Sequence, residues 1–151
     1  MIKKKKKKLP PLPRLKKKAW ELTSLYIRRR YAHDNGMAEC VTCGKWLPWT
    51  EGDAGHWIPQ ARGNSVRYDP RNIHFQCKNC NGRLGSNPAN YAVFMANEYG
   101  VEVMQELLAK SRTVTRYRRQ DYLDIIDDMA GRLASLVSGD IPRVDIDPMG
   151  R

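Results

Sequence analysis

The chain has 151 residues, a net charge of +11 at pH 7 and a hydrophobic fraction of 41%. This length fits one compact domain with extensions. No run of about 18 apolar residues is present, and no apolar segment follows the N-terminal lysines, so neither a membrane span nor a secretory signal is expected. We therefore expect a cytoplasmic protein.

Positive charge is concentrated at the N-terminal end. Residues 1–31 contain 13 lysine and arginine residues against Glu21 alone, a net charge of +12, so the remainder of the chain is close to neutral. In residues 1–14 like charges repel and prolines interrupt regular structure, which predicts a disordered basic arm. A lysine run attracts any polyanion without reading its sequence. The arm is predicted to bind nucleic acid through Lys3, Lys4, Lys5, Lys6, Lys7 and Lys8; a solvated tail or a nuclear-type address are the alternatives.

An N-terminal helix is predicted in residues 15–36. The apolar positions repeat with helical spacing up to about Tyr31, and "HDNG" (His33 to Gly36) supplies residues that tolerate the backbone of a helix end. The predicted buried face consists of Leu15, Ala19, Leu22, Leu25 and Tyr26.

The rest of the chain divides into short strands and then helices. Residues 37–86 read as strands and turns, with the segments "CVTCGKW", "AGHWIP", "NIHFQC" and "CNGRLGS". Residues 87–137 are predicted to be helical: one helix begins at Asn87 and Pro88 and stops at Gly100, a second follows, and Thr115 caps a third. Residues 138–151 are predicted to be a flexible tail. The expected buried positions are Tyr91, Phe94, Met95, Val103, Leu107, Leu108, Tyr122, Ile125, Ile126, Met129 and Leu133.

Four cysteines form two pairs with the same spacing. Cys40 and Cys43 are one Cys-x-x-Cys pair, and Cys77 and Cys80 are the other. Two such pairs complete the tetrahedral thiolate shell that zinc prefers, and in a reducing compartment a metal site is favoured over disulfides. The sequence therefore predicts a structural zinc site with a long insert between its halves. Free core thiols are the alternative.

The insert carries a second pattern, "GHWIP…RNIHFQCKNCN". It resembles the ββα-metal motif of HNH nucleases, in which a strand bearing His, a second strand opened by Asn, and a helix starting with His or Asn follow one another. The ending "CKNCNGRLG" is similar to that of phage recombination endonuclease VII. Together with "DAGHW", "ARGN" and the C-terminal helix, the arrangement is similar to the phage NinG (Rap) recombination proteins. This specific resemblance covers about Cys40 to Gly85.

The resemblance implies an α+β fold: a small zinc-braced ββα-metal (HNH-like) core in residues 37–86, flanked by an N-terminal helix and C-terminal helices. It also implies roles for three residues. His56 matches the general base, and its ordinary pKa near 6.5 suits that task. Asn81 matches a ligand of catalytic Mg²⁺ or Mn²⁺, and Asn72 matches a residue that fixes the loop by hydrogen bonding. A packing role beside Trp57 is the alternative for His56.

One position departs from the family pattern. The residue before the base is usually an Asp or His metal ligand, and here it is Gly55. Asp53 would share the face of Gly55 on a strand and supply the carboxylate; alternatively Asp53 is a turn residue, and Asn81, phosphate and water hold the ion. His74 is predicted to face away from its neighbours, with a structural role favoured over one at the active site or on DNA.

The implied function is a metal-dependent, structure-selective DNA endonuclease acting on branched recombination intermediates such as Holliday junctions. Arg62 and Arg83 are predicted to hold phosphates. This function fits a homodimer formed through the helix from Thr115. It also fits phage recombination proteins as partners and a location in the host-cell cytoplasm. The alternatives are a non-catalytic zinc-containing DNA- or RNA-binding regulator and a sequence-specific HNH nuclease of restriction or homing type.

Overall fold

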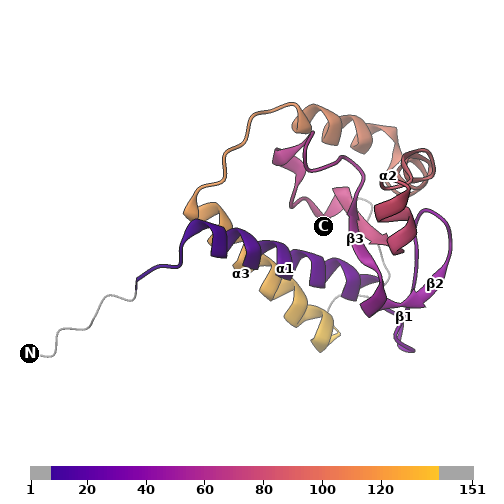
Figure 1. Cartoon of the computed structure of the whole chain (residues 1–151), viewed down its shortest axis with the longest axis horizontal. Coiled ribbons are helices and arrows are strands. Elements are labelled where there is room, and N and C mark those ends of the chain that lie inside the picture. The colour runs from indigo at the N-terminus through magenta and orange to yellow at the C-terminus, as the bar shows by residue number, and fades with distance from the viewer. Residues whose placement is uncertain (1–7, 140–151) are drawn as a thin grey trace, which may run out of the picture.

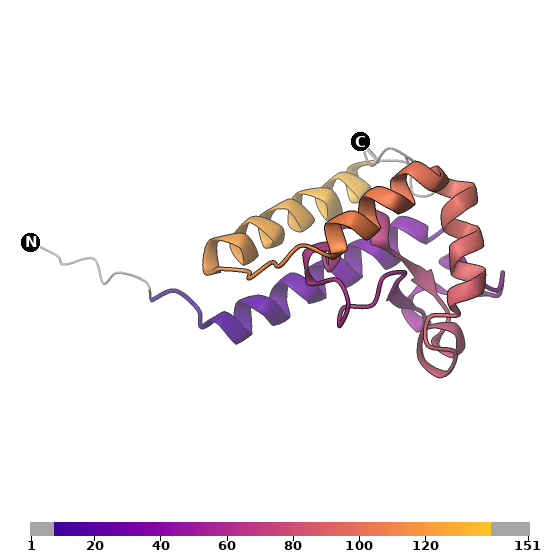
Figure 2. The same ribbon diagram turned by 90° about the horizontal axis from the view of Figure 1, so that it is seen from above.

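The computed structural model describes residues 8–139, which form an α+β structure of three helices and two small sheets. Helices α1 (Leu12–Tyr31) and α3 (Arg119–Ser138) lie side by side and run in the same direction (Figures 1 and 2). The other elements lie between them in the sequence: β1 (Met37–Glu39), β2 (Trp46–Pro48), β3 (Asp53–His56), β4 (Ile73–Gln76) and α2 (Pro88–Ser111), with short helical turns at Trp49–Glu51, Asn64–Val66, Pro70–Asn72 and Asn79–Arg83.

The β3–β4 hairpin lies between α1 and α2 and presents a different environment on each face. The two strands are antiparallel, with Asp53 opposite Gln76 and His56 opposite Ile73. Because side chains alternate along a strand, Ala54 and His56 face α1, where Ala54 and Ile73 join a core with the α1 side chains. Asp53, Gly55, His74 and Gln76 face the opposite side, toward α2 and the turn at Asn79–Arg83. The β1–β2 pair forms a separate antiparallel sheet.

Helix α1 begins at Leu12, three residues before the predicted start. Pro13 falls in its first turn, where a missing backbone N–H costs nothing. The arm prediction therefore fails for the last three residues of 1–14, while residues 1–7 lie outside the described part. The buried face is also broader than the periodicity suggested: Leu22 and Leu25 are half-buried, and the fully buried side chains are Leu15, Ala19, Thr23, Tyr26, Ile27, Arg30 and Tyr31.

Two details of the C-terminal helices differ from the predictions. Helix α3 starts at Arg119 rather than at Thr115, because Asn64 binds this segment in an extended conformation: its Nδ2 donates to the Thr115 carbonyl at 2.8 Å, and its carbonyl accepts from the Tyr117 hydroxyl at 2.7 Å. Leu108 is 39% exposed instead of buried. Five other positions expected to be buried are half-buried: Phe94, Val103, Ile125, Ile126 and Leu133. The predicted break at Gly100 is present as a kink in α2, where φ is 83°.

The apolar face of α3 packs against α1 within the same chain. Tyr122, Met129 and Leu136 are buried there, so these side chains pack within one chain. A homodimer through this helix stays a prediction. No helix among residues 8–139 has the length and apolarity needed to cross a membrane. Of the predicted tail, Ser138 is the last residue of α3 and Gly139 is its C-cap, whereas residues 140–151 lie outside the described part.

Candidate functional site

The four cysteines converge into one cluster, as their spacing predicted. Cys40, Cys43, Cys77 and Cys80 place their Sγ atoms within 4.8 Å of one another. Gly44 closes the first turn: its N–H donates to the Cys40 carbonyl at 2.9 Å, and its φ of 74° lies in the left-handed region that glycine adopts readily. The donor set and its compactness fit a tetrahedral metal ion such as zinc.

The electrostatics of the cluster also fit a bound cation. Burial, together with neighbouring thiols, raises the pKa of Cys43 and Cys77. Burial likewise disfavours ionisation of Cys40, but hydrogen bonds from Thr42, Cys77 and Cys43 outweigh it and lower the pKa of this thiol to about 7. Four thiolates this close repel one another, so a divalent cation is what would allow all four to ionise.

The cluster is connected to β4 by Thr42. The Thr42 hydroxyl lies 3.3 Å from Cys40 Sγ, and it accepts a hydrogen bond from Gln76 Nε2 at 3.1 Å. Gln76 Nε2 also donates to the Ser86 carbonyl at 2.9 Å, and the whole Gln76 side chain is buried. Sequence reasoning missed Gln76, because nothing in its local pattern distinguishes it from an ordinary polar strand residue.

Asp53 and Asn81 are brought together from positions 28 residues apart. Asn81 follows Cys80 in the helical turn at Asn79–Arg83, and its Nδ2 donates to Asp53 Oδ2 at 3.1 Å. Lys78 Nζ lies 2.9 Å from the other Asp53 oxygen. Asp53 is a β3 residue and not a turn residue, and it shares the face of Gly55. These oxygen atoms can hold a hard divalent cation.

His56 lies on the opposite face of β3 from this group. Its Nε2 is 2.8 Å from the Arg67 carbonyl, an acceptor, so Nε2 carries the proton. Nδ1 is then the basic nitrogen, and it accepts a long hydrogen bond of 3.5 Å from Gln60 Nε2. Trp20 of α1 stacks on the ring with centroids 5.1 Å apart, and only 6% of His56 is exposed. Burial lowers the pKa of His56, so the imidazole is neutral at pH 7. Within residues 8–139 no hydrogen bond joins His56 to Asp53 or Asn81.

Two further residues of the pattern hold the framework in place. The fully buried Asn72 accepts from the Ile58 N–H at 2.8 Å and donates to the Ile58 and Val66 carbonyls, so it fixes the loop after His56. His74 is also fully buried. Its Nδ1 donates to the Tyr91 hydroxyl at 2.9 Å, because that hydroxyl itself donates to the Gly55 carbonyl.

The second ring nitrogen of His74 accepts from the Tyr99 hydroxyl at 2.8 Å. Both nitrogens are therefore occupied by α2, and His74 faces neither the Asp53–Asn81 pair nor solvent. These contacts favour the structural role. The predicted phosphate-binding side chains are placed differently: Arg62, Arg83 and Lys8 are exposed, and Lys3 to Lys7 lie outside the described residues.

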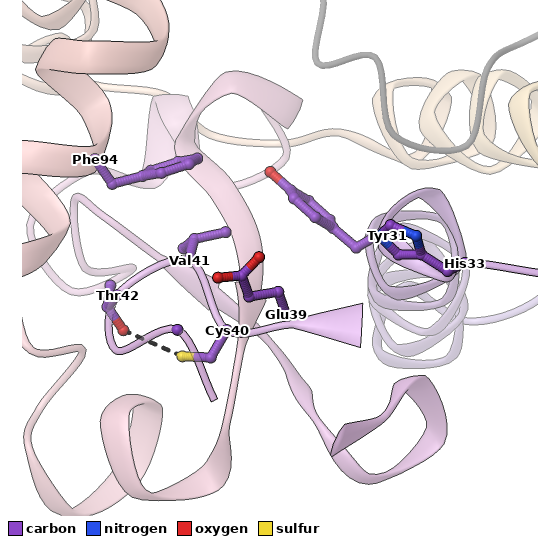
Figure 3. Close-up of a pocket in the computed structure, with 8 residues that line it drawn as sticks. Tyr31, His33, Glu39, Cys40, Val41, Thr42 and Phe94 are labelled. Atoms are coloured by element: carbon purple, nitrogen blue, oxygen red, sulfur yellow. Dashed lines mark hydrogen bonds between the residues drawn. The ribbon is translucent and has the colours of Figure 1, made fainter. Parts of the chain in front are cut away.

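A cavity of about 310 Å³ lies beside the cysteine cluster. Figure 3 shows Phe94 of α2 on one side and Tyr31 of α1 on the other, with Val41 and Glu39 between them. Of the predicted site residues, only Cys40 lines it. The cavity is thus separate from the Asp53–Asn81 pair, and it lies where α1, α2 and the first cysteine pair meet.

The match to a family model covers residues 1–138, and that model is described as Bacteriophage Lambda NinG protein. The chain belongs to the NinG family. Over 91 residues, 60% of this chain, it is 35% identical to protein ninG of Escherichia phage 933W and 33% identical to those of Salmonella phage P22 and Escherichia phage lambda. The matched segment spans 42–43% of these relatives. No solved structure matches the chain.

Proposed function

We propose that this NinG-family chain is a metal-dependent DNA endonuclease that hydrolyses phosphodiester bonds in branched recombination intermediates in the host cytoplasm. The observation that supports it best is the 3.1 Å contact between Asn81 and Asp53, which places two oxygen-bearing side chains beside the metal-binding cysteines. The order of β3, β4 and the turn bearing Asn81 is the order of the HNH ββα-metal motif. Asp53, on the same face of β3 as Gly55, would supply the carboxylate ligand.

His56 has the chemistry of a general base. Because Nε2 is held by the Arg67 carbonyl, Nδ1 is the nitrogen that would take a proton from water, and the water would have to replace Gln60 Nε2, which donates to Nδ1 at 3.5 Å. A bound Mg²⁺ or Mn²⁺ would supply charge stabilisation at the phosphate and the leaving 3′ oxygen. Asp53 and Asn81 would hold that ion. Since His56 is the last residue of β3, the phosphodiester would lie across the end of this strand to reach both groups.

The exposed basic residues of this chain are better suited to recognising the shape of branched DNA than to reading a base sequence. Direct readout requires side chains held against base edges in a groove, and residues 8–139 contain no second domain beside the α+β structure. The exposed Arg62 and Arg83 and the lysine arm would bind backbone phosphates, which position DNA without reading it. A homodimer and phage recombination partners remain proposals within this function.

A second candidate function follows from the burial of His56. With 6% exposure beneath Trp20, the ring resembles a packing histidine, and a non-catalytic zinc module that binds DNA or RNA has no need of a general base. This candidate keeps the cysteine cluster and the basic arm but makes Asp53 and Asn81 structural.

The test is cleavage of end-labelled four-way junction, Y-fork and linear duplex by the zinc-loaded chain, with Mg²⁺ or with EDTA added briefly. We expect Mg²⁺-dependent cleavage of the branched substrates. His56→Ala should reduce the rate by about 10²–10⁴-fold, the usual contribution of a general base, while zinc content and DNA affinity are unchanged. A His56→Ala protein as active as wild type would favour the non-catalytic zinc module.

A further inference from the structure

Gln76 carries a buried oxygen with no protein partner. The side chain has no exposed surface, and Oε1 makes no hydrogen bond within residues 8–139. Its amide orientation is fixed, because Nε2 donates to the Ser86 carbonyl, which can only accept. The Thr42 hydroxyl holds Nε2 on another side. A desolvated carbonyl oxygen in this state is rare and indicates a missing ligand, ion or water.

This oxygen points at the position in front of Gly55. A Cβ at residue 55 would clash with Gln76 Oε1 and would lie 2.8 Å from Asn81 Oδ1. The two oxygens therefore flank one point on the face of β3. Asn81 Nδ2 is bonded to Asp53, so it is the Oδ1 end of Asn81 that faces this point. Asp53 contributes its carboxylate from the same face of the strand.

We propose that Gln76 Oε1 is a third protein ligand of a divalent cation held with Asp53 and Asn81, and that Gly55 is glycine because the ligand comes from the opposite strand. The inference rests on the proposed function, since the cation is the one assigned there to Asp53 and Asn81. One carboxylate and two carboxamide oxygens are ligands suited to Mg²⁺ or Mn²⁺, and they leave coordination positions for water and phosphate.

The register of the hairpin explains how Gln76 can supply the ligand that the HNH pattern has at position 55. Gln76 lies directly opposite Asp53 in the β3–β4 ladder, so its longer side chain extends along the same face toward residue 55. Any side chain at residue 55 would fill the position that Gln76 Oε1 occupies. The glycine at position 55 and the burial of Gln76 thus have the same explanation, namely that the Gln76 side chain occupies the space in front of residue 55.

A cationic side chain already contacts the proposed site. Lys78 places its ammonium 2.9 Å from Asp53, and 71% of its side chain is exposed. A positively charged group already rests against this oxygen set, and it is free to move into solvent when a metal ion takes its place. Lys78 is the basic side chain that touches Asp53 in the described part of the chain.

The experiment is a titration of the zinc-loaded full chain with Mn²⁺, with free ion followed by electron paramagnetic resonance. We expect one bound Mn²⁺ per chain. Gly55→Ala should weaken binding by at least about tenfold, since even the loss of an outer-shell partner costs that much. Gln76→Glu, which adds a negative charge at the same atom, should strengthen it. The matched control is Gly82→Ala, because a Cβ at Gly82 meets no atom within 4 Å.

The outcomes separate this inference from the proposed function. If Asp53→Ala and Asn81→Ala weaken Mn²⁺ binding and cleavage while Gly55→Ala and Gln76→Glu leave the affinity unchanged, Gln76 is not a ligand and the nuclease proposal stands. If wild type binds no Mn²⁺, both ideas fail. A purely structural Gln76 predicts that Gln76→Glu lowers the melting temperature without raising affinity. Should Gln76→Glu fail to fold, the comparison of Gly55→Ala with Gly82→Ala decides.

Discussion

At the scale of single residues, the chemistry of β3 changes from one position to the next. Gly55 faces oxygen atoms, whereas His56 lies beneath Trp20 with one nitrogen held by a carbonyl. A metal ion and a neutral imidazole have opposite needs, because the cation requires anionic oxygen and the base must stay unprotonated. Opposite faces of one strand provide both environments within two adjacent residues.

The state of His56 leads to a prediction about pH. Burial lowers its pKa below the ordinary value of 6.5, and the hydrogen bond to Arg67 only partly offsets this. In the proposed mechanism the neutral form is the base, so we expect kcat/KM to rise with pH through a pKa below 6.5 and then level off. Trp20→Ala should admit water and move the midpoint to higher pH. The measurement is a pH–rate profile for both proteins; a wild-type midpoint at or above 6.5 would contradict it.

The sequence identified some of these residues and could not identify others. His56, Asn72, Asn81 and Asp53 were indicated by the resemblance of their order to the HNH pattern. Gln76 and Trp20 reach the site only through the strand register and the packing of α1, and neither is encoded in a local pattern. The prediction for His74 favoured the structural role that the two tyrosine hydroxyls now explain.

At the scale of elements, the cysteine cluster connects both ends of the hairpin region. The pair Cys40 and Cys43 precedes β2, and the pair Cys77 and Cys80 follows β4 directly. The cluster thereby closes a loop that contains β3, while Thr42 joins it to Gln76. A metal ion at the cysteines would hold the hairpin at its open end.

Removing one zinc ligand should therefore unfold the central region. Cys40→Ser or Cys77→Ser should lose the metal and the cooperative unfolding transition, because binding free energy of a structural zinc is folding free energy. Elemental analysis should give about one zinc per wild-type chain and none for these variants. Thr42→Val keeps all four thiols and is the control: it should retain zinc. A folded, metal-free wild type would exclude a structural metal.

Two residues of α3 can test whether its apolar face packs within one chain or between two chains. Met129 is 2% exposed against α1, whereas Val137 is 73% exposed. Met129→Ala should lower the free energy of unfolding by about 2–5 kcal/mol, the usual cost of truncating a buried side chain, and Val137→Ala should change it little. Urea denaturation at two protein concentrations is the measurement. A midpoint that moves with concentration would indicate that this face is shared between two chains.

Helices were easier to predict than their ends. The kink at Gly100 was visible in the sequence, because a glycine between two apolar patterns permits a positive φ. The start of α3 was not, because Thr115 is held extended by Asn64. That contact spans 51 residues and competes with the local capping preference of threonine. Local pattern decides where helices form, and distant contacts decide where they begin.

At the scale of the whole molecule, the basic N-terminal segment is separate in sequence from the proposed catalytic site. The proposed site lies in the central, nearly neutral part of the chain, whereas 13 of the 27 lysine and arginine residues lie in residues 1–31. Helix α1 links the two regions: its N-terminal end continues from the lysine run, and Trp20 in its middle covers His56. The arm would thus hold DNA close to the hairpin without forming part of the site.

Deleting residues 1–8 should test whether the arm binds DNA without forming part of the site. The cut removes Lys3 to Lys8 but spares Pro10, whose carbonyl accepts from Arg119 at the start of α3. We expect binding to junction, fork and duplex to weaken equally. Each released phosphate contact contributes about 0.9 to the slope of log K against log salt, so the slope should fall by up to about 5.

The matched control replaces the six lysines by glutamine, which keeps the length of the arm and removes its charge. It should reproduce the deletion, because the attraction arises from counterion release rather than from chain length. Binding is measured by fluorescence anisotropy across a salt series, with melting temperature as the check on folding. If the preference for branched DNA disappears while duplex affinity is retained, the arm reads DNA structure directly, and junction selectivity would then belong to the arm instead of to the zinc-braced core.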